Sequence, residues 1–222
     1  YVIHEVIISN SLLKGKFAFK NETVQQVVSG SNVRIKKLNI DNVTLAIGDS
    51  HTSKLFSVKE AALKIYNLQI AKNDTLSPAI IDMMDFSAAE FNSVTADSNY
   101  SIKAGGINYT ANSKHLSIDS LHLLPNFSDY IFIDRSKYET DRFDVQVNNV
   151  YVNDFSAIDF ISTGNLECAF IKIGEMNLSA FRDKRKEFLH TPRATFQEDI
   201  YSFPGKLHID SIEVKSGNIS YI

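Results

Sequence analysis

The apolar residues of this chain recur in a fixed spacing. An apolar residue is followed by a second one two positions later, by a third three positions after that, and by a fourth two positions further on. Residues 33–40, VRIKKLNI, show the spacing first, and two later copies, LSIDSLHL and LHIDSIEV, agree even at polar positions. The apolar positions of the six copies are Val33, Ile35, Leu38 and Ile40; Leu63, Ile65, Leu68 and Ile70; Leu116, Ile118, Leu121 and Leu123; Val145, Val147, Val150 and Val152; Ile171, Ile173, Met176 and Leu178; and Leu207, Ile209, Ile212 and Val214.

This spacing predicts β-strands with one apolar face. Strict alternation places a row of apolar side chains on one face of a strand. The three-residue step would turn the second half of each copy to the other face, unless a β-bulge absorbs the extra residue there. A helix is disfavoured by the β-branched residues and by the Asn-rich breaks between copies. We therefore predict six long, bent strands whose four apolar side chains share a face.

Further alternating runs lie between the copies and are expected to pair with them. These runs are residues 42–47, 100–109 and 217–222. Gly105 and Gly106 are expected to form a tight turn or a bulge. The chain is thus predicted to be all-β, mostly an antiparallel meander of long bent strands forming a curved sheet with one apolar face. The alternative is a β-sandwich, in which a second sheet covers that face.

Helix is expected in one or two short segments. Ser77 and Pro78 suit the first turn of a helix that would reach about residue 85, and residues 154–161 suit another turn or two. Residues 21–30 fit a helix or a strand. Long loops are expected at residues 124–125 and 181–192. We interpret residues 1–222 as a single elongated β domain and a fragment of a longer chain, because the sequence starts at Tyr1 without Met and stops inside an alternating run.

Composition limits the classes of function. A hydrophobic fraction of 44% is ordinary for an ordered protein, and a formal net charge of −3 gives no electrostatic reason to expect nucleic acid. No run approaches the roughly 20 apolar residues that cross a bilayer. The single cysteine, Cys168, allows no internal disulfide, and its apolar neighbours indicate a buried structural thiol.

No residue pattern indicates catalysis, a cofactor or a metal. The six histidines are dispersed, with no Cys/His cluster, and His122 falls on an outward polar position. Asp82 and Asp85 would share a face of the short predicted helix, which is more often a surface pair than an acid/base pair. The basic run at residues 182–186 contains or adjoins Asp183 and Glu187. We interpret this run as a solvated loop with internal charge compensation, in preference to a phosphate or lipid-headgroup site. The chain is therefore not expected to be an enzyme.

The C-terminal half resembles a known family. Residues 181–188, FRDKRKEF, lead through a polar linker to residues 203–222, FPGKLHIDSIEVKSGNISYI. Together with LHLLP at 121–125 and DRFDVQVNNVYV at 141–152, these segments are similar to large AsmA-like bacterial envelope proteins of the Bacteroidetes type. The first half is similar in rhythm only.

The resemblance implies a periplasmic or cell-envelope protein whose parent chain is anchored to the inner membrane by a segment outside this sequence. It implies a β groove that binds or conducts lipid acyl chains for outer-membrane lipid homeostasis. Lipid or membrane, and proteins of the envelope, are then the expected partners. The alternative function is a surface β-sandwich module for adhesion or protein assembly. The residues expected to contact lipid are Val33, Ile35, Leu38, Ile40, Leu63, Ile65, Leu116, Ile118, Leu121, Val147, Val150, Ile171, Ile173, Leu207, Ile209 and Ile212.

Overall fold

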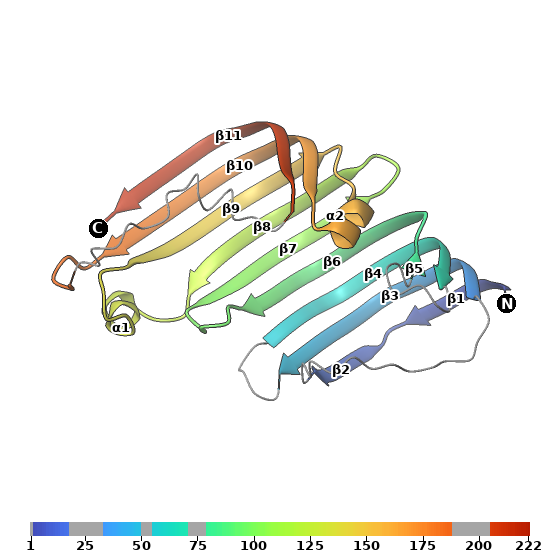
Figure 1. The fold of residues 1–222 in the computed structure, drawn as a ribbon, viewed down its shortest axis with the longest axis horizontal. Coiled ribbons are helices and arrows are strands. Elements are labelled where there is room, and N and C mark those ends of the chain that lie inside the picture. Colours follow the sequence, from blue (N-terminus) through green and yellow to red (C-terminus); the bar gives the residue numbers. More distant parts are fainter. Residues whose placement is uncertain (1, 18–32, 50–54, 71–78, 188–204) are drawn as a thin grey trace.

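A computed structural model describes residues 2–17, 33–49, 55–70, 79–187 and 205–222 (Figure 1). In this part of the chain eleven strands form one open, curved sheet. The strands are β1 Val2–Ser9, β2 Leu12–Phe17, β3 Val33–Asp49, β4 Leu55–Ile70, β5 Ala79–Ile80, β6 Met83–Val94, β7 Tyr100–Thr110, β8 His115–Pro125, β9 Asp141–Asn153, β10 Leu166–Arg182 and β11 Leu207–Tyr221; the helices are α1 Asp129–Asp134 and α2 Ala157–Thr163.

The all-β prediction with a curved sheet is confirmed, and the sandwich alternative is wrong for the described residues, because they contain no second sheet. The strand order is β1-β3-β4-β6-β7-β8-β9-β10-β11, with β2 also on β3 and β5 on β4. Neighbours from β3 to β10 are antiparallel, as a meander requires. Only the edges of the sheet depart from the antiparallel pattern, since β1 and β2 run parallel to β3, and β11 runs parallel to β10.

All six copies of the apolar spacing lie in strands, within β3, β4, β8, β9, β10 and β11. The strands are longer than the copies, because residues 42–47 continue β3 and residues 217–221 continue β11 instead of forming separate strands. The four apolar side chains of a copy do share a face. Val145, Val147, Val150 and Val152 of β9 all belong to one cluster on the inner, concave side of the sheet.

The three-residue steps form a continuous row across the sheet. Between β8 and β9, Ile118 pairs with Val150 and Ser120 with Asn148, so that Asp119 and Asn149 are left out of the ladder together. We call the residues left out at this level the skipped row. Its members on β6 to β11 are Ala89, Gly106, Asp119, Asn149, Gly174 and Lys215.

The skipped row replaces the bulges that the sequence predicts there. A bulge sets two residues of one strand against one of its neighbour. Here both neighbours contain the extra residue at the same level, so the pairing stays in register on either side of the row. Gly106 and Asn149 adopt positive φ, 63° and 55°, a conformation that Gly and Asn tolerate best. Gly105 and Gly106 therefore lie inside β7, and the tight-turn alternative is wrong.

Three further predictions are corrected. The helix expected from Ser77 is wrong over residues 79–85, where β5 and the start of β6 lie; Ser77 and Pro78 fall outside the described residues. Pairing with β4 on one side and β7 on the other outweighs the local helix-start signal. The long loops expected at residues 124–125 and 181–192 begin later than predicted. Residues 124–125 still belong to β8, which is followed by the helix α1 that the sequence did not predict, and residues 181–182 still belong to β10. The ambiguous residues 21–30 are outside the described part of the chain.

The two helices cover only the ends of the inner face (Figure 1). At one end α1 buries Phe132 and Ile133, and the Phe132 ring lies 5.2 Å from that of Tyr100. At the other end lies α2, which overlaps the expected segment 154–161 and ends two residues after it. It begins after Ser156, whose hydroxyl accepts a hydrogen bond from the Asp159 amide. Neither helix is long enough to cross a bilayer.

Candidate functional site

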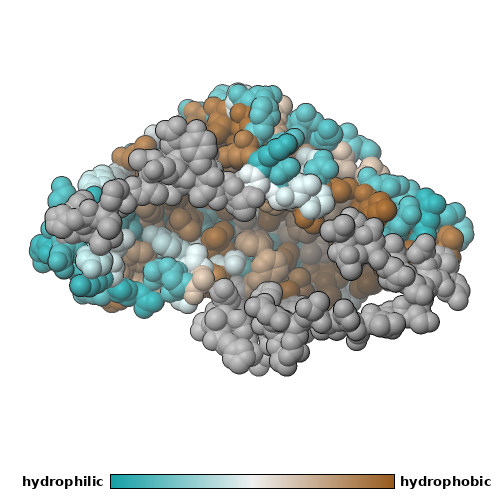
Figure 2. Space-filling model, in the orientation of Figure 1, coloured by the Kyte–Doolittle hydropathy of each residue, from teal (hydrophilic) through white to brown (hydrophobic). Residues whose placement is uncertain are grey.

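The inner face contains an apolar hollow of about 770 Å³ (Figure 2), where brown, hydrophobic side chains gather in a recess. It lies over β3, β4, β6, β7 and β8, and α2 closes one side. None of the described lining residues is charged. The lining residues are Leu13, Ile40, Val43, Leu45, Phe56, Val58, Ala61, Leu63, Met84, Phe86, Phe91, Ile107, Tyr109, Leu116, Ile118, Phe155, Ala157, Phe160 and Ile161.

The hollow exists because an apolar row on each strand faces inward and no second sheet covers it in the described part of the chain. The inward side chains of adjacent strands lie next to one another across the floor of the hollow. Leu63 of β4, for example, is opposite Ile40 of β3 and Phe86 of β6. The Phe56 and Phe91 rings meet edge-to-face at 5.2 Å. Such a wall offers hydrocarbon contact to a ligand without fixing its orientation.

The only polar atom on a described wall side chain is the Tyr109 hydroxyl, and the protein itself uses it. The hydroxyl donates a hydrogen bond to the Phe155 carbonyl and accepts one from the Ala157 amide, both at 3.2 Å. The Tyr109 ring also lies 5.8 Å from that of Phe155, in an edge-to-face arrangement. Tyr109 therefore ties the floor of the hollow to the start of α2.

The residues predicted to contact lipid fall into three groups. Ile40, Leu63, Leu116 and Ile118 line the hollow. Six others belong to the neighbouring central cluster around Phe155 and Cys168, in which Leu116 and Ile118 also take part: Leu121, Val147, Val150, Ile171, Ile173 and Ile209.

The third group lies outside both. Its members are on β3 and β4, where they continue the inner rows beyond the hollow, and on the edge strand β11: Val33, Ile35, Leu38, Ile65, Leu207 and Ile212. The structure thus brings four of the sixteen predicted residues together in the hollow itself.

Sequence reasoning missed the aromatic part of the site. Phe86 and Phe91 lie on β6, and Phe155 and Phe160 lie at α2. The signal for β6 was present, since Met84, Phe86, Ala88 and Phe91 follow steps of two, two and three residues. The helix-start residues just before it obscured this pattern. No comparable signal in the sequence indicated that α2 would fold over the floor.

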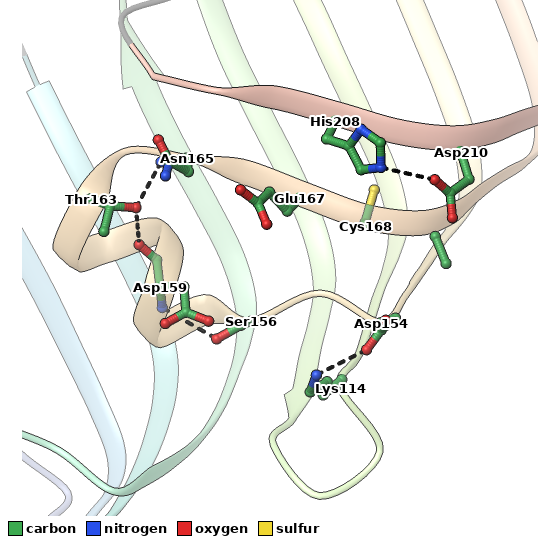
Figure 3. A pocket seen from close by; sticks show the side chains of 11 residues that line it. Lys114, Asp154, Ser156, Asp159, Thr163, Asn165, Glu167, Cys168, His208 and Asp210 are labelled. Atoms are coloured by element: carbon green, nitrogen blue, oxygen red, sulfur yellow. Dashed lines mark hydrogen bonds and ion pairs between the residues drawn. The ribbon is translucent and has the colours of Figure 1, made fainter.

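A second pocket, of about 410 Å³, lies on the polar side of α2 (Figure 3). Four of its side chains form two pairs: Lys114 Nζ lies 3.0 Å from Asp154 Oδ1, and His208 Nε2 lies 3.1 Å from Asp210 Oδ1. Thr163 Oγ1 donates to the Asp159 carbonyl and accepts from the Asn165 amide. These contacts fix the ends of α2 and the turn after it.

Cys168 also borders this pocket, but it is a poor nucleophile. Burial raises the pKa of the Cys168 thiol, and the negative charge of Asp210 raises it further. The thiol is therefore protonated and unreactive near neutral pH. In the described residues no group of three or more His, Cys, Asp or Glu side chains is arranged to hold a metal ion.

Five other candidate residues from the sequence have structural partners. His122 is half-buried and contacts Asp144 at 2.7 Å. Asp85 Oδ1 accepts a hydrogen bond from the Ala111 amide. In the basic run, Arg182 pairs with Asp141, Arg185 with Asp183, and Lys186 with Asp134. This pairing fits charge compensation and leaves little of the run for a phosphate.

Comparison of the chain with protein-family models, with curated proteins and with solved structures finds no match in any of the three.

Proposed function

We propose that this chain is a non-catalytic segment of an AsmA-like cell-envelope protein that binds or conducts lipid acyl chains along its inner face. The observation that carries the proposal is the hollow of about 770 Å³ with no charged group among its described lining residues. Its volume falls in the range of small-molecule sites, roughly 300–1,000 Å³. Its lining suits hydrocarbon and disfavours a charged headgroup, which would lose its hydration there.

The mechanism is non-covalent. Each methylene group removed from water contributes about 0.8 kcal/mol, so a buried stretch of ten methylenes contributes about 8 kcal/mol before the entropic cost of association. Because this force has no direction, a chain can shift along the inner rows without breaking a specific bond. The headgroup would remain outside the hollow.

The placement in the periplasm and the role in outer-membrane lipid homeostasis depend on the family resemblance of residues 121–125, 141–152, 181–188 and 203–222. In the proposal, the hollow is one stretch of a longer apolar path, and the parent protein is anchored to the inner membrane. Lipid is the principal partner, and no catalytic residue is assigned.

The test uses native mass spectrometry with lipid extraction on protein purified from a bacterial envelope. Leu13→Asp and Ile161→Asp place a charge at the hollow, at side chains that are 51% and 70% exposed, so the fold should survive. Ile80→Asp is the matched control, because Ile80 is 52% exposed and does not line the hollow.

We expect phospholipid to co-purify with the wild type and with Ile80→Asp, and to be depleted in the other two variants. A wild-type protein that is folded and free of lipid would contradict the proposal. Equal lipid in all four proteins would show that the lipid binds elsewhere, and would contradict it as well.

A further inference from the structure

We propose that Phe155 is a stop at one end of the hollow and limits the length of the acyl chain that the hollow accepts. The inference rests on the proposed lipid binding and adds to it a residue that determines specificity. Phe155 lies between β9 and α2, is 8% exposed and lines the hollow. It also belongs to the central cluster, so it lies where the hollow and the cluster meet.

The hollow does not end because the chemistry of its floor changes. It reaches β8, where Ile118 lines it. Ile118 is opposite Val150 of β9, which is opposite Ile173 of β10. The neighbouring row across the same three strands is apolar as well: Leu116, Val152 and Ile171. An acyl chain that lies across the strands would therefore find the same kind of floor on β9 and β10 as on β8.

What changes beyond β8 is the cover over the floor. Val150 and Val152 are 8% and 7% exposed and belong to one cluster with Phe155. The described residues shared by the hollow and this cluster lie on floor strands, except Phe155 and Ala157, which come from the segment that leads into α2. Of these two only Phe155 has a bulky side chain, and its ring lies 5.9 Å from the Phe160 ring of α2. The Phe155 ring is therefore the end wall of the hollow on this side.

The backbone holds Phe155 in this position. Its amide donates a hydrogen bond to the Lys114 carbonyl at 3.0 Å, and its carbonyl accepts one from the Tyr109 hydroxyl at 3.2 Å. Asp154 and Ser156, on either side of it, border the polar pocket (Figure 3), whereas Phe155 borders the apolar hollow. Neither hydrogen bond uses the Phe155 side chain. A substitution there can therefore change the wall without removing the contacts that hold the start of α2.

A stop predicts a limit on chain length. Up to that limit, each added methylene group leaves water and should raise the affinity about fourfold. A methylene group that finds no room on the near side of Phe155 stays in water and adds little to the affinity. Affinity should therefore rise with chain length and then level off, and the length at which it levels off depends on residue 155.

The test measures the affinity of the full chain for saturated fatty acids of about 10 to about 20 carbons, a series that grows by methylene groups. Displacement of a fluorescent fatty-acid analogue gives each affinity. Phe155→Leu removes the ring and keeps a buried apolar side chain, which limits the loss of stability. Phe91→Ala is the control, because Phe91 lines the hollow and does not belong to the central cluster.

For the wild type we expect the affinity to level off within the series. Phe155→Leu should move this length toward longer chains, by up to roughly four methylene groups, which span one strand spacing of about 4.8 Å. Phe91→Ala should change the affinity by a similar factor at every length and leave the levelling-off length in place.

Three results would overturn the inference and leave lipid binding standing: a levelling-off length that Phe155→Leu does not change, one that Phe91→Ala moves equally, or a wild-type affinity that rises over the whole series. A wild type that binds none of these acids would instead contradict the proposed function, and the inference with it.

A second measurement needs no variant. A fatty acid of the limiting length with a photoreactive diazirine at its methyl end is bound to the wild type and irradiated, and peptide mass spectrometry locates the adducts. We expect adducts on the lining of the hollow up to Phe155. Adducts on Val147 or Ile173, which lie in the central cluster and do not line the hollow, would overturn the inference even where Phe155→Leu does not fold.

Discussion

Two glycines of the skipped row leave no room for a side chain. Gly106 combines a φ of 63° with a close approach to β8, where a β-carbon on residue 106 would lie 2.8 Å from Asp119 Cβ and still closer to the Asp119 carboxylate. Gly174 is confined in a similar way, because an added β-carbon would lie 2.9 Å from Asn149 Cβ. The row therefore needs glycine on β7 and on β10.

We predict that Gly106→Ala lowers the free energy of unfolding by about 2–4 kcal/mol, from left-handed backbone strain together with the contact to Asp119. Urea unfolding measures this. Gly217→Ala is the control, because Gly217 has no close neighbour under 3.9 Å and no positive φ; its effect should stay below about 1 kcal/mol. Equal losses in the two variants would contradict the assignment of strain to Gly106.

A second prediction concerns Asp183, at the turn after β10. Hydrogen bonds from the Arg185 side chain and backbone amide lower the pKa of Asp183 from its ordinary value of 3.8 to about 2. Because the folded-state pKa is depressed, this contact stabilises the turn above pH 3.8 and is lost as the pH falls toward 2.

Arg185→Gln should move the pKa of Asp183 back toward 3.8, since it removes the guanidinium and keeps the backbone amide. NMR titration of the side-chain carboxyl carbon follows the change. Lys184→Gln removes a neighbouring charge without removing a hydrogen bond to Asp183, and should shift the pKa much less. A larger shift from Lys184→Gln would show that general charge, and not Arg185, depresses the value.

At the scale of elements, one side chain of β7, Tyr109, joins the sheet to the start of α2. Tyr109→Phe removes the hydroxyl that joins Phe155 and Ala157 and leaves the Ala157 amide without this acceptor. We predict a loss of about 1–3 kcal/mol in the free energy of unfolding. Amide hydrogen exchange should also speed up in α2 more than in β8 and β9. Tyr151→Phe is the control, because Tyr151 is exposed; a similar effect there would contradict the proposed tie.

The strands were largely predictable from the sequence, and their extent and neighbours were not. The spacing identifies β8, β9 and β10 because each contains a full copy with β-branched residues. The prediction missed β6, because the helix-start signal of Ser77 and Pro78 obscured its spacing; pairing with β4 and β7 outweighs that signal. Parallel pairing of β1, β2 and β11 leaves no trace in the spacing, because alternation is the same in both directions.

The hollow was predictable only in part. Sequence predicts which side chains of a strand face inward, so Ile40, Leu63, Leu116 and Ile118 were identified. It does not show where a helix covers that face. Val147 and Val150 therefore lie in the closed central cluster near Phe155, while Ile107 and Phe91 line the open hollow. Coverage depends on contacts between distant segments, which local patterns do not contain.

At the scale of the whole molecule, the sheet keeps part of its apolar face uncovered among the described residues. A folded protein with such a face should bind anilinonaphthalene sulfonate and raise its fluorescence at neutral pH, a response otherwise typical of molten globules. We expect this under conditions where unfolding is still cooperative, and oleate should displace the dye. Ile161→Asp should reduce the signal and Ile80→Asp should not. Native protein that leaves the dye dark would show that the inner face is closed.

The skipped row has a consequence for how such a chain can change in evolution. Each strand from β6 to β11 contains its extra residue at the same level. Inserting or deleting one residue in a single strand would place half of its inward side chains on the wrong face. Duplicating an entire hairpin, in contrast, copies the step and preserves the match. The number of strands can therefore vary, whereas the level of the extra residue is fixed for all of them at once.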